Sequence, residues 1–150
     1  MSRKPCYANI IYIIVLLLSI LFLYTATSKL LHLDIFQLRL QRMPYIAPLA
    51  TGLVWYVPFM ELLIAGLLLI PKYRILGLYA SLVLLALFTG YIGTVLQFSD
   101  SIPCSCGGAL SALGWKDHLV FNGACMAMAL WAIILNKKLH QKTFLDQNTT

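Results

Sequence analysis

The spacing of the charged residues constrains this chain more than any other feature. Residues 5–28, 75–99 and 119–136 contain no Asp, Glu, Lys or Arg, and residues 44–70 contain only Glu61. A hydrocarbon core of ~30 Å is crossed by about 20 apolar residues in a helix. Each stretch is long enough to span a bilayer. The sequence therefore predicts one membrane domain, residues 1–150, with spans at about 7–28, 46–70, 75–97 and 117–136.

Composition excludes the soluble alternatives. Charged residues make up 11% of the chain and hydrophobic residues 61%, whereas a soluble domain carries about 25% charged residues. Residues 10–18 are apolar without alternation, unlike a strand of a membrane β-barrel. We therefore expect an all-α integral membrane four-helix bundle in contact with lipid. We expect no nucleic-acid binding, because the net charge of +6 is spread over short connections.

Lysine and arginine also predict the orientation. More of them flank the side that holds both termini and the second connection, which indicates cytoplasmic termini under the positive-inside rule. On that side are Arg3, Lys4, Lys72, Arg74, Lys137, Lys138 and Lys142, against Lys29, Arg39, Arg42 and Lys116 on the other. The polar tail, 137–150, is then cytoplasmic, and the third connection, 98–116, faces outwards. A cleavable signal is the rival interpretation of the first apolar run, but that run is longer than the usual 7–15 residues.

The first connection predicts a short interfacial helix. Leu33, Phe36, Leu40 and Met43 share one helical face, and polar side chains occupy another. Pro44 separates this segment from the second span. We expect the helix to lie along the outer leaflet or to cap the bundle.

The third connection contains two cysteines separated by one residue. Exposed thiols on an oxidising side form and exchange disulfides, and a bridge between Cys104 and Cys106 would require a bent backbone. Pro103 stiffens the entry to this segment, and Gly107 and Gly108 allow a sharp exit. Strained bridges are labile and oxidising, so these cysteines are the candidate exchanging pair.

Other interpretations of the pair remain open. The cysteines could form a structural bridge that shapes the loop, or stay reduced without a role. They could also provide half of a metal site, for which His118 is the nearby additional ligand. We assign no metal. His118 begins the fourth span and could instead stabilise a thiolate or be an ordinary interfacial residue. Cys125 lies within that apolar span and is expected to be an inert buried thiol, and Cys6 lies on the cytoplasmic side.

Glu61 is the acidic residue within a predicted span. A charge near the centre of a span costs at least ~2.5–3.5 kcal/mol on insertion scales, so Glu61 must face the bundle interior, carry a proton or have a partner. Lys29, near the outer end of the first span, is the basic residue that could approach it. A neutral, hydrogen-bonded packing role for Glu61 is the alternative.

These features together resemble the methylamine-utilisation protein MauE family, within the wider DoxX-like group of four-helix membrane proteins. The resemblance covers most of the chain and rests on three segments: YTATSKL at 24–30, PFMELLIAGLLL at 58–69 and CSCGG at 104–108. It implies a bacterial inner-membrane protein that helps to mature a disulfide-rich dehydrogenase subunit alongside a thioredoxin-like partner. It implies redox positions at Cys104 and Cys106 and intramembrane polar positions at Lys29 and Glu61. The Gly107–Gly108 ending departs from the glycine-aromatic ending of methylamine-pathway members.

We therefore predict a redox-associated bacterial inner-membrane protein that supports periplasmic thiol-disulfide exchange. Its expected partner is a periplasmic thioredoxin-like protein or a disulfide-containing client. A membrane quinone, as used by four-helix thiol oxidases, is the candidate cofactor, although no sequence motif marks a quinone site. Two alternatives are a non-enzymatic assembly protein with a structural Cys-Xaa-Cys loop and a membrane protein that handles a metal or small solute.

Overall fold

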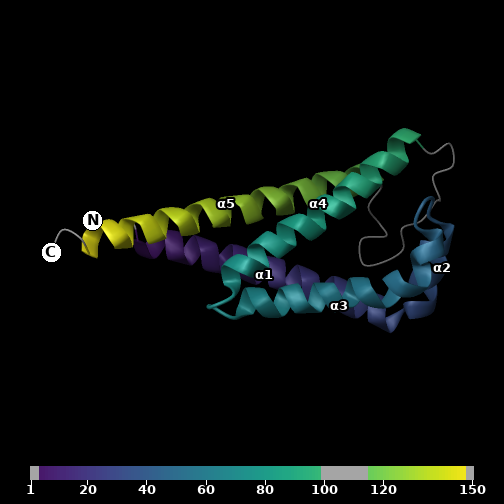
Figure 1. Ribbon diagram of the computed structural model, residues 1–150, viewed down its shortest axis with the longest axis horizontal. Coiled ribbons are helices and arrows are strands. Elements are labelled where there is room, and N and C mark those ends of the chain that lie inside the picture. Colours follow the sequence, from purple (N-terminus) through teal and green to yellow (C-terminus); the bar gives the residue numbers. More distant parts are fainter. Residues whose placement is uncertain (1–3, 99–114, 148–150) are drawn as a thin grey trace.

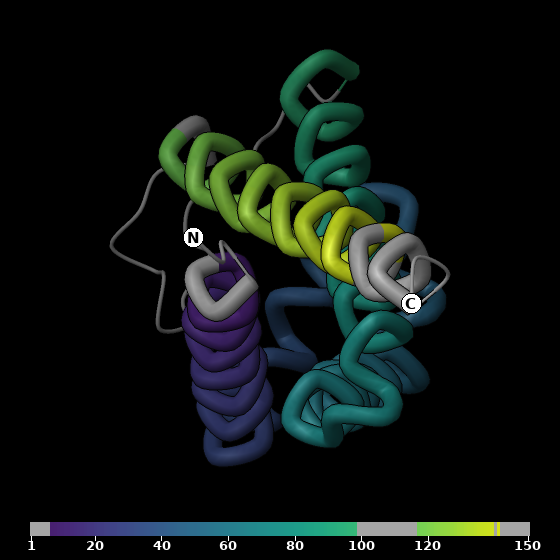
Figure 2. Tube along the Cα trace, turned by 90° about the vertical axis from the view of Figure 1, so that its left-hand side faces the viewer, coloured from purple at the N-terminus to yellow at the C-terminus, as the bar shows by residue number. Residues whose placement is uncertain are grey.

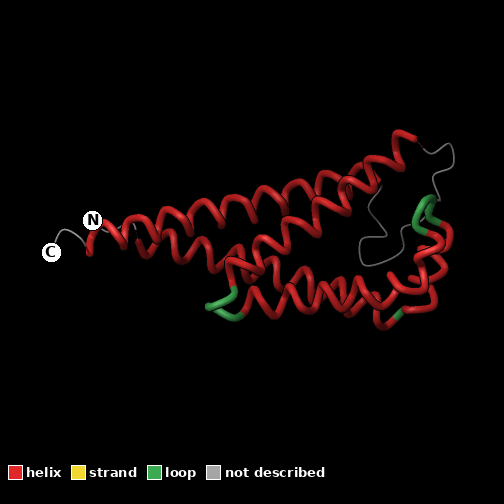
Figure 3. The backbone as a smooth tube through the Cα atoms, in the orientation of Figure 1, coloured by secondary structure: helices red, strands yellow, loops and turns green. Residues whose placement is uncertain are grey.

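A computed structural model describes residues 4–98 and 115–147 of the chain. All the regular structure in these ranges is helical (Figure 3). The elements are α1 (Lys4–Leu31), α2 (Leu33–Arg42), a 3-10 turn (Ala47–Leu49), α3 (Ala50–Leu69), α4 (Arg74–Phe98) and α5 (Trp115–Gln147). The predicted all-α class is confirmed.

Four of the helices are long and apolar enough to cross a membrane. The candidate spans are Tyr7–Leu31, Ala47–Leu69, Arg74–Phe98 and Asp117–Leu139. Each contains the middle of a span predicted from the charge-free stretches. The difference lies at the ends, since α5 continues to Gln147 through most of the predicted polar tail. Helix α5 continues past its apolar segment because no Pro or Gly follows that segment to interrupt the backbone hydrogen bonds.

The four long helices form an elongated bundle in which neighbours in sequence run in opposite directions (Figure 1). Helix α1 packs against α3 and α5, and α4 closes the ring by packing against α3 and α5. Figure 2 shows the bundle viewed from one end, where α1 and α5 are neighbours. Helices α3 and α5 do not contact each other within the described ranges. Side chains on α3 and α5 can therefore face a common interior from opposite sides.

Apolar side chains fill the interior of the bundle and also cover its outside. Leu18, Ile64, Leu68 and Leu78 are essentially fully buried, whereas Leu17, Leu63 and Leu87 are exposed. Apolar side chains on both faces are expected of helices surrounded by lipid. The buried serines need no partner from another helix, because Ser19 and Ser81 donate to backbone carbonyls one turn earlier, at 2.8 and 2.7 Å.

The predicted amphipathic helix is α2, and it packs against the first turns of α3. Leu40 is buried with Ala50 and Val54, and Leu33 and Phe36 pack around this small cluster. Tyr45 makes the turn that follows with φ 69°, and the Tyr91 hydroxyl of α4 donates to the Pro44 carbonyl at 2.9 Å. The apolar face expected from the sequence is confirmed, and α2 is fixed to the end of the bundle.

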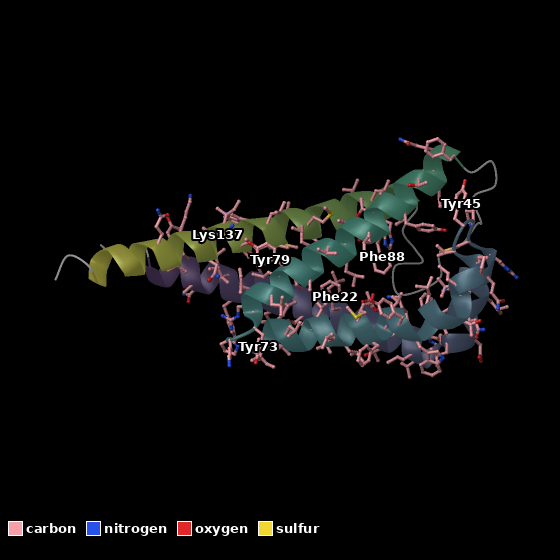
Figure 4. All side chains as sticks on the ribbon, viewed as in Figure 1. Phe22, Tyr45, Tyr73, Tyr79, Phe88 and Lys137 are labelled. Carbon is pink, nitrogen blue, oxygen red and sulfur yellow. The ribbon has the colours of Figure 1, made fainter. Side chains whose placement is uncertain are left out.

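Cations lie beside aromatic rings at the end of the bundle opposite α2. Figure 4 shows Tyr73 and Lys137 towards one end and Tyr45 towards the other. At the first end, Lys72 lies over the Tyr73 ring at 5.5 Å, and Arg74 lies over the Tyr12 ring at 5.9 Å. Aromatic rings beside cations are typical of a membrane interface. We call this the basic end, and the end that carries α2 the α2 end.

One glycine sets the distance between α3 and α4. A Cβ atom at Gly77 would lie 2.8 Å from the Leu68 backbone nitrogen, whereas one at Gly66 would meet nothing within 4 Å. We expect Gly77→Ala to lower the thermal unfolding midpoint in detergent, because overpacking costs about 1–3 kcal/mol. Gly66→Ala is the matched control and should leave the midpoint unchanged or raise it. Equal midpoints for the two variants would show that α4 is not held against α3 as described.

Candidate functional site

A buried ion pair joins α1 to α3 near the α2 end of the bundle. The Lys29 ammonium donates to Glu61 Oε1 at 2.6 Å. Lys29 lies in the last turn of α1 and Glu61 lies in the interior of α3. The pairing proposed from the sequence is therefore present in the structure. It satisfies the requirement that a charge inside a span has a partner.

The two members of the pair are buried to different degrees. The Glu61 side chain is 3% exposed and the Lys29 side chain is 23% exposed. Lys29 also lies 5.9 Å from the centre of the Phe36 ring on α2, in a cation-π arrangement. The sequence indicated only that Phe36 belongs to the apolar face of α2. Three helices therefore meet at the Lys29 ammonium.

Two further groups surround or oppose this carboxylate in the interior. The Thr25 hydroxyl of α1 interacts with the Glu61 carboxyl, although no donor meets Glu61 Oε2 at ordinary hydrogen-bond geometry. The Asn122 amide nitrogen on α5 is buried without a hydrogen-bond partner among the described residues. Asn122 is 4% exposed. Buried polar atoms are nearly always paired, so the Asn122 amide nitrogen is an exception among the buried polar groups of the described residues.

His118 lies in the first turn of α5 and is half-buried. It precedes Asn122 by one helical turn, so both face the same side of α5. The structure thus pairs Lys29 with Glu61, and it places His118 on the same side of α5 as Asn122.

The candidate exchanging cysteines lie outside the described residues. Cys104 and Cys106, together with Pro103, Gly107 and Gly108, fall in the range 99–114. Their roles remain predictions. The helices that flank them are described, and the end of α4 and the start of α5 lie towards the α2 end of the bundle (Figure 1).

Cys125 is a free buried thiol on α5, as its apolar neighbourhood predicted. It lines an apolar groove between α1 and α5 with a cavity volume of about 320 Å³. Leu17, Leu21 and Tyr24 of α1 and Phe121 and Met128 of α5 also line it. The sequence did not predict this groove, because its lining residues are ordinary apolar residues of two spans that are brought together by helix packing. Among the described side chains, no group of three His, Cys, Asp or Glu residues could hold a metal ion.

Four apolar helices around a buried Lys-Glu pair define a multi-pass membrane protein with a polar site inside its spans. The family model described as "Methylamine utilisation protein MauE" matches residues 7–135, which is most of the chain. The chain belongs to the MauE family, and the resemblance stated from the sequence is confirmed. Comparison with curated proteins and with solved structures gives no match.

Proposed function

We propose that this protein supports disulfide formation in a periplasmic client by thiol-disulfide exchange at Cys104 and Cys106, as part of methylamine utilisation. One observation carries the proposal: the end of α4 and the start of α5, between which the cysteines lie in the sequence, are at the end of the bundle opposite the basic end. Under the positive-inside rule the basic end is cytoplasmic. The cysteines then face the oxidising periplasm, where disulfides persist.

The proposed exchange conserves electrons and protons between its two partners. A thiolate of a thioredoxin-like protein or of the client attacks one sulfur of the Cys104–Cys106 bridge and forms a mixed disulfide. A second thiolate of the same partner then attacks the mixed disulfide. The partner leaves oxidised, and Cys104 and Cys106 are left as two thiols, with the protons of the partner thiols transferred to them.

The Lys29–Glu61 pair supports this proposal through its position. It lies towards the same end of the bundle as the helix termini that flank the cysteines, and it is linked through Phe36 to α2. We also propose that the protein lies in the inner membrane with both termini in the cytoplasm, because the positive-inside rule places the basic end on the cytoplasmic side. The pair holds α1, α2 and α3 together at this end of the bundle.

Thiol labelling in intact cells tests the orientation and the bridge together. Variants that retain only Cys104 and Cys106 are treated with a membrane-impermeant maleimide, before and after mild reduction. We expect labelling only after reduction, because an external bridge protects both sulfurs until it is opened. A variant that retains only Cys6 should stay unlabelled in both conditions. Labelling of Cys104 and Cys106 only after the membrane is permeabilised would contradict the proposal.

A further inference from the structure

We propose that the turn between α3 and α4 binds one anionic phospholipid at the basic end of the bundle, with the lipid phosphate held by Arg74 and Lys72. The ligand class is a lipid whose headgroup carries a net negative charge, such as phosphatidylglycerol. The site is separate from the cysteines and from the Lys29–Glu61 pair, so it does not depend on the proposed function.

The turn lies where the hydrocarbon region of a bilayer gives way to lipid headgroups. One candidate span ends at Leu69 and the next begins at Arg74, so residues 70–73 connect two spans. Tyr73 lies in this turn and is 42% exposed. Exposed tyrosines at the ends of spans are typical of the headgroup level. The cations of the turn are therefore at the depth of lipid phosphates.

Two aromatic rings hold the cations of the turn. The Arg74 guanidinium lies 5.9 Å from the centre of the Tyr12 ring of α1, and the Lys72 ammonium lies 5.5 Å from the centre of the Tyr73 ring. The Tyr12 side chain is 57% exposed, so the guanidinium stands beside a ring on the outside of the bundle. A cation over a ring is attracted by the ring face and keeps its N–H donors for another partner.

The Arg74 guanidinium lacks an acceptor of its own. Its Nε atom is buried and has no hydrogen-bond partner among the described residues. Residues 1–33 and 62–99 contain no Asp or Glu, and the Glu61 carboxylate is paired with Lys29. Buried polar atoms are nearly always paired, and arginine keeps its charge in proteins. An anion from outside these helices is therefore the expected partner, and two phosphate oxygens match the guanidinium fork.

The start of α4 also favours an anion at this place. Arg74 stands in the first turn of α4, and that turn contains no acidic residue. Gly77 N–H donates to the Tyr73 carbonyl at 2.9 Å, so the N–H groups of residues 74–76 precede the first hydrogen bond of the helix. A helix start has a positive potential, which a nearby cation increases. A bound phosphate lowers the energy of both.

Apolar side chains beside the cations favour a lipid over free phosphate. Three side chains that flank the turn are about half exposed: Leu69, Ile70 and Leu76. They offer contacts for acyl chains next to the groups that bind the phosphate. A ligand with an anionic head and apolar tails satisfies both parts of this surface.

Lysines of α5 add to the positive charge at the same end. Lys137 and Lys138 are exposed, and Figure 4 shows Lys137 and Tyr73 towards the same end of the bundle. Clustered cations attract a headgroup with net negative charge and repel the choline cation of a zwitterionic lipid. We therefore expect the site to prefer phosphatidylglycerol to phosphatidylcholine.

Native mass spectrometry of the full-length protein tests the site and the class of ligand. The protein in detergent is titrated with phosphatidylglycerol or with phosphatidylcholine of the same acyl chains, and the dissociation constant of the first bound lipid is measured. We expect phosphatidylglycerol to bind about tenfold more tightly, equivalent to about 1.4 kcal/mol. Equal affinities for the two lipids, or displacement of phosphatidylglycerol by inorganic phosphate at the same concentration, would overturn the proposal.

Two arginine variants provide a matched comparison in the same titration. Arg74→Gln and Arg42→Gln each remove one guanidinium, but Arg42 is exposed on α2 at the opposite end of the bundle. We expect Arg74→Gln to weaken phosphatidylglycerol binding about tenfold, equivalent to about 1.4 kcal/mol, and Arg42→Gln to leave it unchanged. Equal affinities of these two variants would overturn the assignment of Arg74.

Lys72→Gln tests the same turn at a side chain that the fold does not require. Lys72 is exposed, so its replacement leaves the packing of the helices unchanged. We expect about fivefold weaker binding of phosphatidylglycerol and an unchanged helical circular dichroism signal in detergent. If Lys72→Gln binds phosphatidylglycerol as tightly as Arg42→Gln does, the turn is not the lipid site.

Discussion

Lys29→Met is expected to reduce the amount of folded protein in the membrane severalfold. The variant leaves the Glu61 carboxylate, 3% exposed, without its partner at 2.6 Å. Removing one member of a buried ion pair costs about 3–5 kcal/mol, which is a large part of the stability of a typical domain. The measurement is the amount of monodisperse protein recovered after extraction in mild detergent, relative to the wild type.

Glu61→Gln is the matched comparison for this first prediction. It keeps the size and shape of the side chain and removes the charge, and it leaves Lys29, whose 23% exposure allows the ammonium to reach polar surroundings. We expect near-normal accumulation of Glu61→Gln together with a loss of client disulfide formation. Recovery of folded protein in Lys29→Met/Glu61→Leu, which removes both charges, should exceed that of Lys29→Met. If Lys29→Met accumulates normally, the ion pair does not stabilise the bundle.

Cys104→Ser and Cys106→Ser are each expected to lower the yield of correctly disulfide-bonded client by about tenfold or more. A serine hydroxyl is not a thiolate and cannot take part in exchange, so neither variant can complete the cycle. Membrane levels should stay normal, because a bridge that closes so small a ring adds little to chain stability. The client's free thiols are counted by mass spectrometry after alkylation.

Cys6→Ser is the control for the cysteine variants. Cys6 lies at the start of α1, which belongs to the basic end, and its replacement should leave client disulfides unchanged. Normal client oxidation in Cys104→Ser and Cys106→Ser would favour the alternative in which the loop only holds a client. In that case the loop's apolar residues, rather than its sulfurs, would be required.

Most of the fold could be predicted from the distribution of charges. The spans follow from the absence of charge over about 20 residues, and α2 follows from the spacing of Leu33, Phe36 and Leu40. Which helices are neighbours could not be predicted, since every span is apolar on all sides. The close approach at Gly77 is likewise a property of the packed pair α3 and α4.

Only the charged residues of the candidate site could be predicted from the sequence. Glu61 is conspicuous inside a span, and Lys29 is the nearest basic candidate, so their pairing could be proposed in advance. The groove beside Cys125 could not be, because Leu21 and Met128 look like any other span residues. The unpartnered nitrogen of Asn122 also depends on its final surroundings rather than on its neighbours in sequence.

Trapping of a mixed disulfide tests the central claim most directly. Cells that express Cys104→Ser or Cys106→Ser are quenched in acid, alkylated, and examined on non-reducing gels for adducts of the protein. We predict that one of the two variants carries a reducible adduct with a soluble thioredoxin-like protein or a client. Its remaining thiolate attacks the disulfide of an oxidised partner and displaces one partner thiolate, and the variant lacks the second cysteine that would attack this mixed disulfide and release the partner. The absence of any reducible adduct in both variants, together with normal client disulfides, would contradict the account.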